Sequence, residues 1–315
     1  MSVIHDALAG PRPTTVLQPI PLERLGCSIT VVTETFQHTG SFKFRAAWHV
    51  ATHVDNPHVI CASSGNFGQA MAFACQLLGK RCTVVMPETS ARVKVDAVRG
   101  YGATADLVDV RNTPRATRVA QLASDDLSAY VASAYDDPLV IAGNATLGRE
   151  LAMLHNAPNG GFDAILVPVG GGGLASGIIT GLQEQGASVP VIAVEPLLGN
   201  DFAQSFRAGH RVALQKEAST IADGARTMSV GVHNWAILKH GIADVIEVPD
   251  DAIIAGMRRY FLDANLKVEP TGALSLGAVL TKPEQFVGQH VCVIVSGGNV
   301  DPVVYTTALQ AASSE

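Results

Sequence analysis

Short runs of apolar, mainly β-branched residues alternate along the chain with longer segments whose apolar residues recur at helical spacing. The short runs predict buried strands at 29–34, 58–63, 81–86, 105–110, 164–169, 189–194, 244–248 and 290–295. The longer segments predict helices at 69–78, 87–99, 114–124, 138–155, 173–185, 250–265 and 271–280. This alternation is typical of parallel sheets covered by helices. The sequence therefore predicts an α/β protein, with a region of mixed pattern at 199–234.

The composition narrows the class of partner. Of the 315 residues, 47% are hydrophobic and 16% are charged, which is enough apolar material for two lobes with buried cores. The net charge is −6, and no dense block of Lys and Arg occurs. Such a chain offers little to a nucleic acid or to an anionic membrane, so we expect a small-molecule partner.

The cysteine usage and the N-terminus bear on location. The five cysteines are scattered among apolar neighbours and form no Cys-x-x-Cys pair, as is usual for buried thiols in a reducing compartment. The N-terminus lacks the apolar core of a secretion signal, and no run of 18 apolar residues occurs. We therefore predict a cytoplasmic protein.

The segment Thr39-Gly40-Ser41-Phe42-Lys43-Phe44-Arg45 is the first candidate for chemistry. It lies between a polar run and an apolar helical pattern, which places Lys43 near the start of a helix. The partial positive charge of a helix N-terminus, together with burial, lowers the pKa of a lysine and makes its amine nucleophilic. Such a lysine can form a Schiff base; the alternative is an ordinary surface lysine.

Turns rich in Gly, Ser and Asn follow three of the predicted strands, at 64–68, 170–173 and 296–299. Ligands of open α/β sheets bind at this edge. The tetraglycine 170–173 exposes backbone N–H groups at a helix start, an arrangement that suits a phosphate. A plain βα turn is one alternative. Another is a dinucleotide site, because Gly170-x-Gly172-x-x-Ala175 is followed by Glu195, although that site leaves the other two turns unexplained.

Taken together, these segments resemble the fold-type II pyridoxal-phosphate enzymes, in particular their serine/threonine dehydratase and serine racemase branch. The resemblance extends over nearly the whole chain and also includes Thr220-Ile221-Ala222-Asp223-Gly224 and Val268-Glu269-Pro270-Thr271-Gly272. It implies two open, mainly parallel, twisted sheets wrapped by helices, as in tryptophan synthase β, with the cofactor between the lobes. The domains then expected are a large cofactor-binding domain, 1–50 and 138–315, and a small domain, 51–137.

The resemblance also implies roles for individual residues. Lys43 would carry the cofactor and remove the Cα proton, Asn66 would bind its phenolic oxygen, and Ser296 would face its pyridine nitrogen. The full set expected at the cofactor is Phe42, Lys43, Asn66, Gly170, Gly171, Gly172, Gly173, Leu174, Glu269 and Ser296. The substrate is expected to contact Ser63, Ser64, Gly65, Asn66 and Arg118. Arg118 matches only loosely a basic position that binds a second substrate carboxylate in some relatives, and the alternative is a solvated helix face.

The activity implied is that of a dehydratase, or ammonia-lyase, which converts a small β-hydroxy amino acid (L-threonine, L-serine or 3-hydroxyaspartate) to a 2-oxo acid and ammonia. A serine hydroxyl at position 296 does not keep the pyridine nitrogen protonated, so the ring is a weaker electron sink and loss of the β-substituent is favoured. A racemase on the same scaffold is the alternative, with Ser64 as the acid or base on the face opposite Lys43. A β-replacement synthase and a dinucleotide-binding protein are weaker alternatives.

The chain departs from the branch near the expected substrate. It has Ser133-Ala134-Tyr135 where dehydratases often have His-Pro, and Gly143-Asn144-Ala145-Thr146 where they often have Gly-Gln-Gly-Thr. Phe67 replaces a frequent histidine. These differences leave the identity of the substrate side chain open.

A divalent cation is a further expectation from the racemase-like branch. The carboxylates of Glu195 and Asp201 and the carbonyl of Gly199 have the spacing of its oxygen ligands, which select Mg²⁺ or Ca²⁺. The alternative is that these residues are only the polar end of a strand and its loop. The resemblance also leads us to expect a homodimer.

Overall fold

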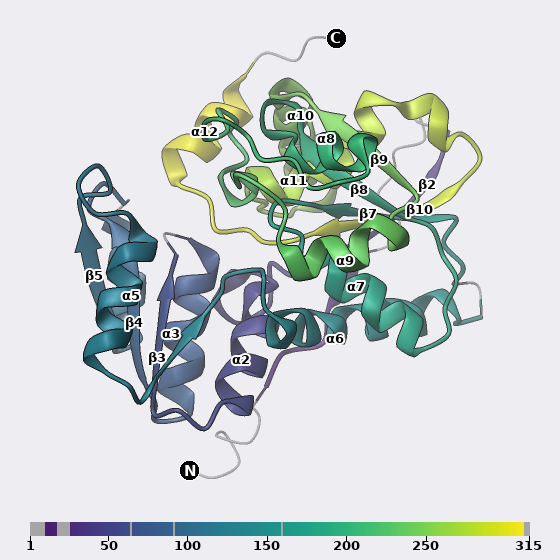
Figure 1. Cartoon of the computed structure of the whole chain (residues 1–315). Coiled ribbons are helices and arrows are strands. Elements are labelled where there is room, and N and C mark those ends of the chain that lie inside the picture. Colours follow the sequence, from purple (N-terminus) through teal and green to yellow (C-terminus); the bar gives the residue numbers. More distant parts are fainter. Residues whose placement is uncertain (1–9, 18–25, 64, 91, 159, 312–315) are drawn as a thin grey trace.

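Two mainly parallel sheets, each in its own lobe, make up the fold in the computed structural model (Figure 1). The structure describes residues 10–17, 26–63, 65–90, 92–158 and 160–311. The larger sheet has the order β1 (Thr15–Leu17), β2 (Ser28–Thr33), β10 (His290–Val295), β7 (Ala164–Pro168), β8 (Val191–Pro196) and β9 (Asp244–Val248). The smaller sheet has the order β5 (Thr104–Val108), β4 (Arg81–Pro87), β3 (His58–Ala62) and β6 (Ala129–Ala132).

Helices cover both sheets. Around the smaller sheet lie α2 (Lys43–His53), α3 (Asn66–Leu77), α4 (Arg92–Gly100) and α5 (Arg115–Asp125). The rest of the chain forms α6 (Pro138–His155), α7 (Gly173–Glu184), α8 (Asp201–Ala208), α9 (Val232–Gly241), α10 (Asp250–Ala264), α11 (Pro270–Thr281) and α12 (Pro302–Gln310). None of the helices in the described part of the chain is long and apolar enough to cross a membrane.

The central parallel strands are buried on both faces, because the helices that connect them cover both sides of each sheet. From Val291 to Val295, every residue of β10 is buried, and its neighbours β2 and β7 both run parallel to it. Continuous apolar runs of this kind are the sequence signature of parallel strands. The short edge strand β1, which is half-buried, is antiparallel to β2.

Helix α6 joins the lobes by packing on both α2 and α7 (Figure 1). Glycines allow the close approach of α6 and α7: a Cβ at Gly148 would clash with the Ile178 carbonyl oxygen, and one at Gly181 would clash with that of Ala145. Larger side chains at either position would push the helices apart.

Most of the predicted elements are confirmed, with shifted ends. The predicted helix at 87–99 begins only at Arg92, and the predicted strand at 189–194 is instead Val191–Pro196. The strands β1 and β6 and the helix α12 were not predicted, and the mixed region contains α8 and α9. The proposed domain boundary at residue 50 stays a prediction; Phe44, Ala47 and Val50 of α2 pack in the core of the smaller lobe.

A buried ion-pair network fixes the start of α2. The guanidinium of Arg45 donates to both carboxylate oxygens of Glu34, at 2.7 and 2.9 Å, and Arg45 and Glu34 are 1% and 0% exposed. Arg45 also pairs with Glu150 of α6 at 2.6 Å. Glu34 directly follows β2, so one side chain ties the larger sheet, α2 and α6 together.

Replacing Arg45 by Met should lower the free energy of unfolding by about 3–5 kcal/mol, because Glu34 would remain as a buried and unpaired charge. Arg149→Met is the matched control: it removes an Arg–Glu pair between α6 and α7 whose side chains are 39% and 45% exposed. The control should lose less than about 1 kcal/mol. Denaturant unfolding of both variants measures the difference, and equal losses would contradict this role of Arg45.

Candidate active site

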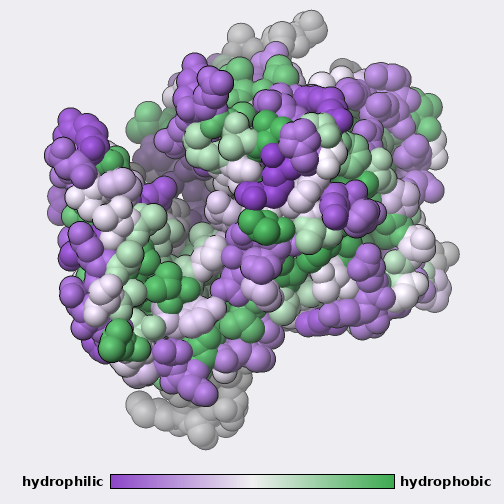
Figure 2. Space-filling model, in the orientation of Figure 1, coloured by the Kyte–Doolittle hydropathy of each residue, from purple (hydrophilic) through white to green (hydrophobic). Residues whose placement is uncertain are grey.

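A cavity of about 360 Å³ lies between the lobes, where the carboxyl ends of strands from both sheets meet. Figure 2 shows the surface hollowed between the smaller lobe at the left and the larger lobe. Ala62 ends β3, Pro168 ends β7, and Ser296 follows β10; all three line the cavity. The structure thus brings together the three turns that the sequence singled out.

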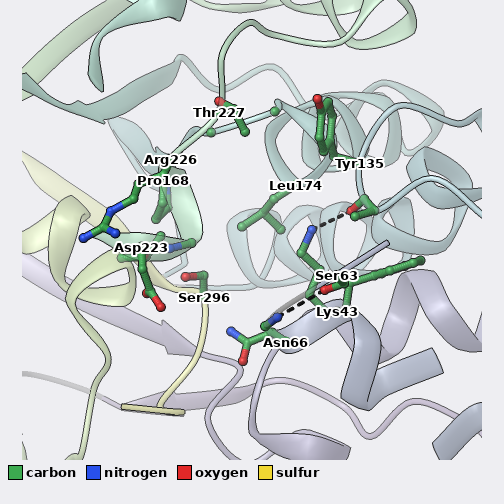
Figure 3. Close-up of a pocket in the computed structure, with 18 of the residues that line it drawn as sticks. Lys43, Ser63, Asn66, Tyr135, Pro168, Leu174, Asp223, Arg226, Thr227 and Ser296 are labelled. Atoms are coloured by element: carbon green, nitrogen blue, oxygen red, sulfur yellow. Dashed lines mark hydrogen bonds between the residues drawn. The ribbon is translucent and has the colours of Figure 1, made fainter. Parts of the chain in front are cut away.

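Lys43 is the first residue of α2 and lines this cavity, as its segment predicted. Its Nζ donates to the carbonyl of Ala134 at 2.6 Å and lies 5.0 and 5.7 Å from the ring centroids of Phe42 and Phe67 (Figure 3). Desolvation lowers the pKa of Lys43 to about 8, although the nearby carboxylate of Glu269 opposes this shift. With this pKa, about a tenth of the amine is neutral and nucleophilic at pH 7, far more than for an exposed lysine.

The Ser296 turn is held directly against the lysine segment. The Phe42 N–H donates to the Ser296 carbonyl at 3.0 Å, and Ser41 bridges to Gly297. Ser296 is 2% exposed, and its Oγ has no partner among the described residues. A buried hydroxyl that lines the cavity without such a partner fits the ring nitrogen of pyridoxal phosphate.

The glycine loop fits the phosphate. Gly170 to Leu174 all line the cavity, and Gly172 adopts a φ of 95°, which favours glycine. The first backbone bond of α7 runs from Ser176 N to Gly172 O, so the N–H groups before Ser176 are the free donors of a helix start. Among the described residues, none accepts a hydrogen bond from Gly170, Gly171 or Gly172 N–H.

Asn66 begins α3 and is held by two neighbours. Its Nδ2 donates to both carboxylate oxygens of Glu269, at 2.9 and 3.1 Å, and its Oδ1 accepts from Asn299 at 2.9 Å. Burial raises the pKa of Glu269 to about 7. Asn66, Glu269 and Lys43 therefore line one cavity, and their contacts with the cofactor stay a prediction from the resemblance.

The loop before α3 carries the residues predicted to bind the substrate carboxylate. Ser63 lines the cavity, and its Oγ accepts the N–H groups of Gly65 at 3.3 Å and Gly68 at 3.0 Å. Gly65 also lines the cavity, whereas Ser64 lies outside the described residues. The role of Ser64 on the second face of the substrate stays a prediction from the sequence.

The structure does not bring Arg118 to the cavity. Its guanidinium forms a bidentate ion pair with Asp106, at 2.8 and 3.1 Å, on an outer face of the smaller lobe. Arg115, the first residue of α5, lines the cavity instead. Arg115 is half-buried and has no ion-pair partner among the described residues. The predicted helix at 114–124 already placed Arg115 at its start, which is the signal that would have identified it.

Charged residues from both lobes meet at the mouth of the cavity and were also missed. Lys94 of α4 pairs with Asp223 at 2.9 Å, which links the smaller lobe to the loop after α8. Arg226 also lines the cavity, and its guanidinium donates to the Thr220 carbonyl. The mouth therefore carries cationic groups from both lobes together with the carboxylates of Glu217 and Asp223.

The predicted metal ligands lie away from the cavity lining. Glu195 and Asp201 are both 0% exposed, and Gly199 lies in the 3-10 turn between them. Glu195 accepts the N–H groups of Phe202 and Ala203, whereas Oδ2 of Asp201 has no partner among the described residues. Burial raises the pKa of Asp201 to about 6 and that of Glu195 as well. In the described ranges, no three His, Cys, Asp or Glu side chains form a metal site.

Known proteins of one family are similar to this protein over most of its chain. The family model described as "Pyridoxal-phosphate dependent enzyme" matches residues 8–297. An L-threo-3-hydroxyaspartate ammonia-lyase of Saccharomyces cerevisiae is 39% identical over 293 residues, covering 91% of this chain and 87% of that one. A serine racemase of Schizosaccharomyces pombe is 35% identical over 272 residues, covering 85% and 82%. The crystal structure of a threonine deaminase from T.th. superposes with a TM-score of 0.86 at 36% identity, covering 92% and 94%.

The pKa of Lys43 predicts how cofactor capture depends on pH. Only the neutral amine attacks an aldehyde, so the rate at which the apoenzyme binds pyridoxal phosphate should rise with pH and level off above about 8. A solvent-exposed lysine, with a pKa of about 10.4, would give a rate that still rises at about pH 9.5. Stopped-flow absorbance measures the capture rate; Lys43→Ala should show no capture, and a wild-type rate that keeps rising like that of an exposed lysine would contradict the assignment.

Proposed function

The chain belongs to the pyridoxal-phosphate dependent enzymes, and on that premise we propose that it is an ammonia-lyase whose substrate is L-threo-3-hydroxyaspartate. Loss of the β-hydroxyl as water leaves an enamine, which tautomerises to an imine. One molecule of water then hydrolyses the imine, and the products are ammonia and a 2-oxo dicarboxylic acid. The similarity to L-threo-3-hydroxyaspartate ammonia-lyases supports the reaction class. The observation that carries the choice of substrate is the guanidinium of Arg115 on the cavity wall, which is unpaired within the described part of the chain.

Arg115 distinguishes the candidate substrates by their charge. L-serine and L-threonine have one carboxylate, whereas 3-hydroxyaspartate has a second one at its β-carbon. A guanidinium recognises a carboxylate with paired, charge-assisted hydrogen bonds, and a half-buried one that no described carboxylate engages is available for this contact. Arg226 adds a second positive charge to the cavity lining, whereas the charge of Lys94 is paired with Asp223.

The other residues of the cavity carry the reaction itself. When bound, pyridoxal phosphate supplies an electron sink for the pair of electrons left at Cα. Lys43 holds the cofactor and removes the Cα proton with its neutral amine, while the glycine loop holds the phosphate. Ser296 offers a neutral hydroxyl to the ring nitrogen, so the electron pair more readily expels the β-hydroxyl.

Racemisation is the second candidate activity, and the similarity to a serine racemase favours it. It requires a proton donor on the face opposite Lys43, which is the role predicted for Ser64. The match of the family model over 8–297 leaves no place for the dinucleotide-binding alternative. A homodimer in the cytoplasm completes the proposal, as the sequence and its resemblance predicted.

A divalent cation, Mg²⁺ or Ca²⁺, is the remaining part of the proposal. The carboxylates of Glu195 and Asp201 are both buried, and one oxygen of Asp201 has no hydrogen-bond partner among the described residues. Burial and the charge of Asp201 raise the pKa of Glu195, and a bound cation would relieve the repulsion between the two carboxylates. The carbonyl of Gly199 would be the third ligand.

Arg115→Gln should lower kcat/KM for L-threo-3-hydroxyaspartate by about 10- to 100-fold, because a hydrogen bond to a charged group is lost. The value for L-serine should stay nearly unchanged, since L-serine has no second carboxylate. Arg118→Gln is the matched control, because Arg118 lies on the same helix but pairs with Asp106 outside the cavity. Initial rates of 2-oxo acid formation test this; equal losses for both substrates would refute the role of Arg115.

Removal of the cation should lower the melting temperature. A cation that binds only the folded state adds roughly 2.7 kcal/mol of stability at a concentration about 100 times its Kd. Chelator should therefore lower the melting temperature of the holoenzyme, and excess Mg²⁺ or Ca²⁺ should restore it. The melting temperature of Asp201→Asn should be the same with and without chelator. A wild-type protein that does not respond to chelator, and that holds no metal by elemental analysis, would exclude the site.

A further inference from the structure

Two buried asparagines hold the outer side of the glycine loop. Asn144 of α6 is 1% exposed, and its Nδ2 donates to the carbonyl of Gly173 at 3.0 Å. Asn234 of α9 is 0% exposed, and its Nδ2 donates to the carbonyl of Gly171 at 2.8 Å. The two amides therefore reach the loop from different helices.

A contact that holds a carbonyl on the outer side of the loop also fixes the direction of the next N–H group on the cavity side. In a planar trans peptide, the C=O and the following N–H point in opposite directions. A fixed Gly171 carbonyl therefore sets the direction of the Gly172 N–H, and a fixed Gly173 carbonyl sets that of Leu174. The Gly171–Gly172 peptide precedes α7, and glycine leaves its dihedral angles free, so contacts from outside the loop are needed to keep its N–H facing the cavity. The Gly231 N–H also donates to the Gly171 carbonyl, at 3.1 Å.

Each of the two asparagine side chains uses its Nδ2 as a hydrogen-bond donor to the loop and leaves its Oδ1 unbonded. The Oδ1 atoms of Asn144 and Asn234 are buried and have no hydrogen-bond partner among the described residues. An orphaned acceptor is unfavourable, and it is retained here because the amide nitrogens face peptide carbonyls. An oxygen in the same place would face those carbonyls with like partial charge.

Asn234 also connects the loop with the lysine. Its Nδ2 donates to the carbonyl of Tyr135 at 3.0 Å, and the neighbouring carbonyl, that of Ala134, accepts the Nζ of Lys43. Asp136 fixes the same segment from its other end by accepting the N–H groups of Val232 and His233 at the start of α9, at 2.8 and 2.9 Å. The side-chain amide of Asn234 therefore contacts both the glycine loop and the segment whose Ala134 carbonyl accepts the Nζ of Lys43.

We propose that Asn144 and Asn234 are positioning residues for the cofactor phosphate: they fix the glycine-loop carbonyls outward so that the Gly172 and Leu174 N–H groups face the phosphate. This inference rests on the cofactor of the proposed function and is independent of the substrate. Asn234, which holds two carbonyls, has the larger effect of the two.

The test compares Asn234→Ala, Asn234→Asp and Asn144→Ala with a matched control, Asn56→Ala. Asn56 also donates from Nδ2 to a backbone carbonyl, that of Ser128 at 2.9 Å, but this contact lies at the surface of the smaller lobe. Pyridoxal phosphate should leave the Asn234 variants about tenfold faster than the wild type after dilution of the holoenzyme. The ³¹P resonance of the bound phosphate should shift in the Asn144 and Asn234 variants only.

Pyridoxal, which lacks the phosphate, separates positioning from general loss of structure. Its affinity should be nearly the same in wild type and Asn144→Ala, whereas that for pyridoxal phosphate falls. Release rates and ³¹P resonances equal to those of Asn56→Ala would overturn the proposal, as would equal losses of affinity for pyridoxal and pyridoxal phosphate. The cofactor release rate and the ³¹P resonance are both measured without substrate, so their outcome is independent of whether the enzyme prefers 3-hydroxyaspartate.

Discussion

The position of Lys43 depends on the buried ion pair between Glu34 and Arg45. Charges with 0% and 1% exposure are tolerated in a protein interior only when they are paired, so the pair forces the start of α2 against the end of β2. Lys43 lies two residues before Arg45 and is thereby brought to the edge of the larger sheet, although α2 packs in the core of the smaller lobe. The lysine is buried, and this desolvation supplies the neutral amine.

Glycine serves two physical purposes in this fold. Along α6 and α7 it allows backbone contacts that join the lobes, and in 170–173 it leaves peptide N–H groups open to the cavity. The second use requires rigidity as well as space, because a flexible loop would lose part of its binding free energy in becoming ordered. The buried amides of Asn144 and Asn234 supply that rigidity from outside the cavity.

The sequence predicted best what depends on local pattern. Parallel strands such as β7 and β10 are continuous apolar runs, and the turns after them are marked by Gly and Ser. The strand β6 was missed because its apolar run is only four residues long and is only partly buried. Arg118 was named from a loose match to the family and Arg115 was not considered, because the sequence does not show which residue of one helical turn meets an acidic neighbour, here Asp106. The contacts of Asn144 and Asn234 join segments 29 and 63 positions apart and become visible only in the fold.

The central claim is that the lysine buried at the start of α2 holds the cofactor. Borohydride reduction of the holoenzyme fixes the cofactor to its lysine, and peptide mass spectrometry after digestion then identifies that residue. The account predicts the added phosphopyridoxyl mass on Lys43 in near-stoichiometric amount, with Lys94 at the mouth of the same cavity unmodified. A modification on Lys94 or on any other lysine, or an active holoenzyme in which Lys43 stays unmodified, would contradict it.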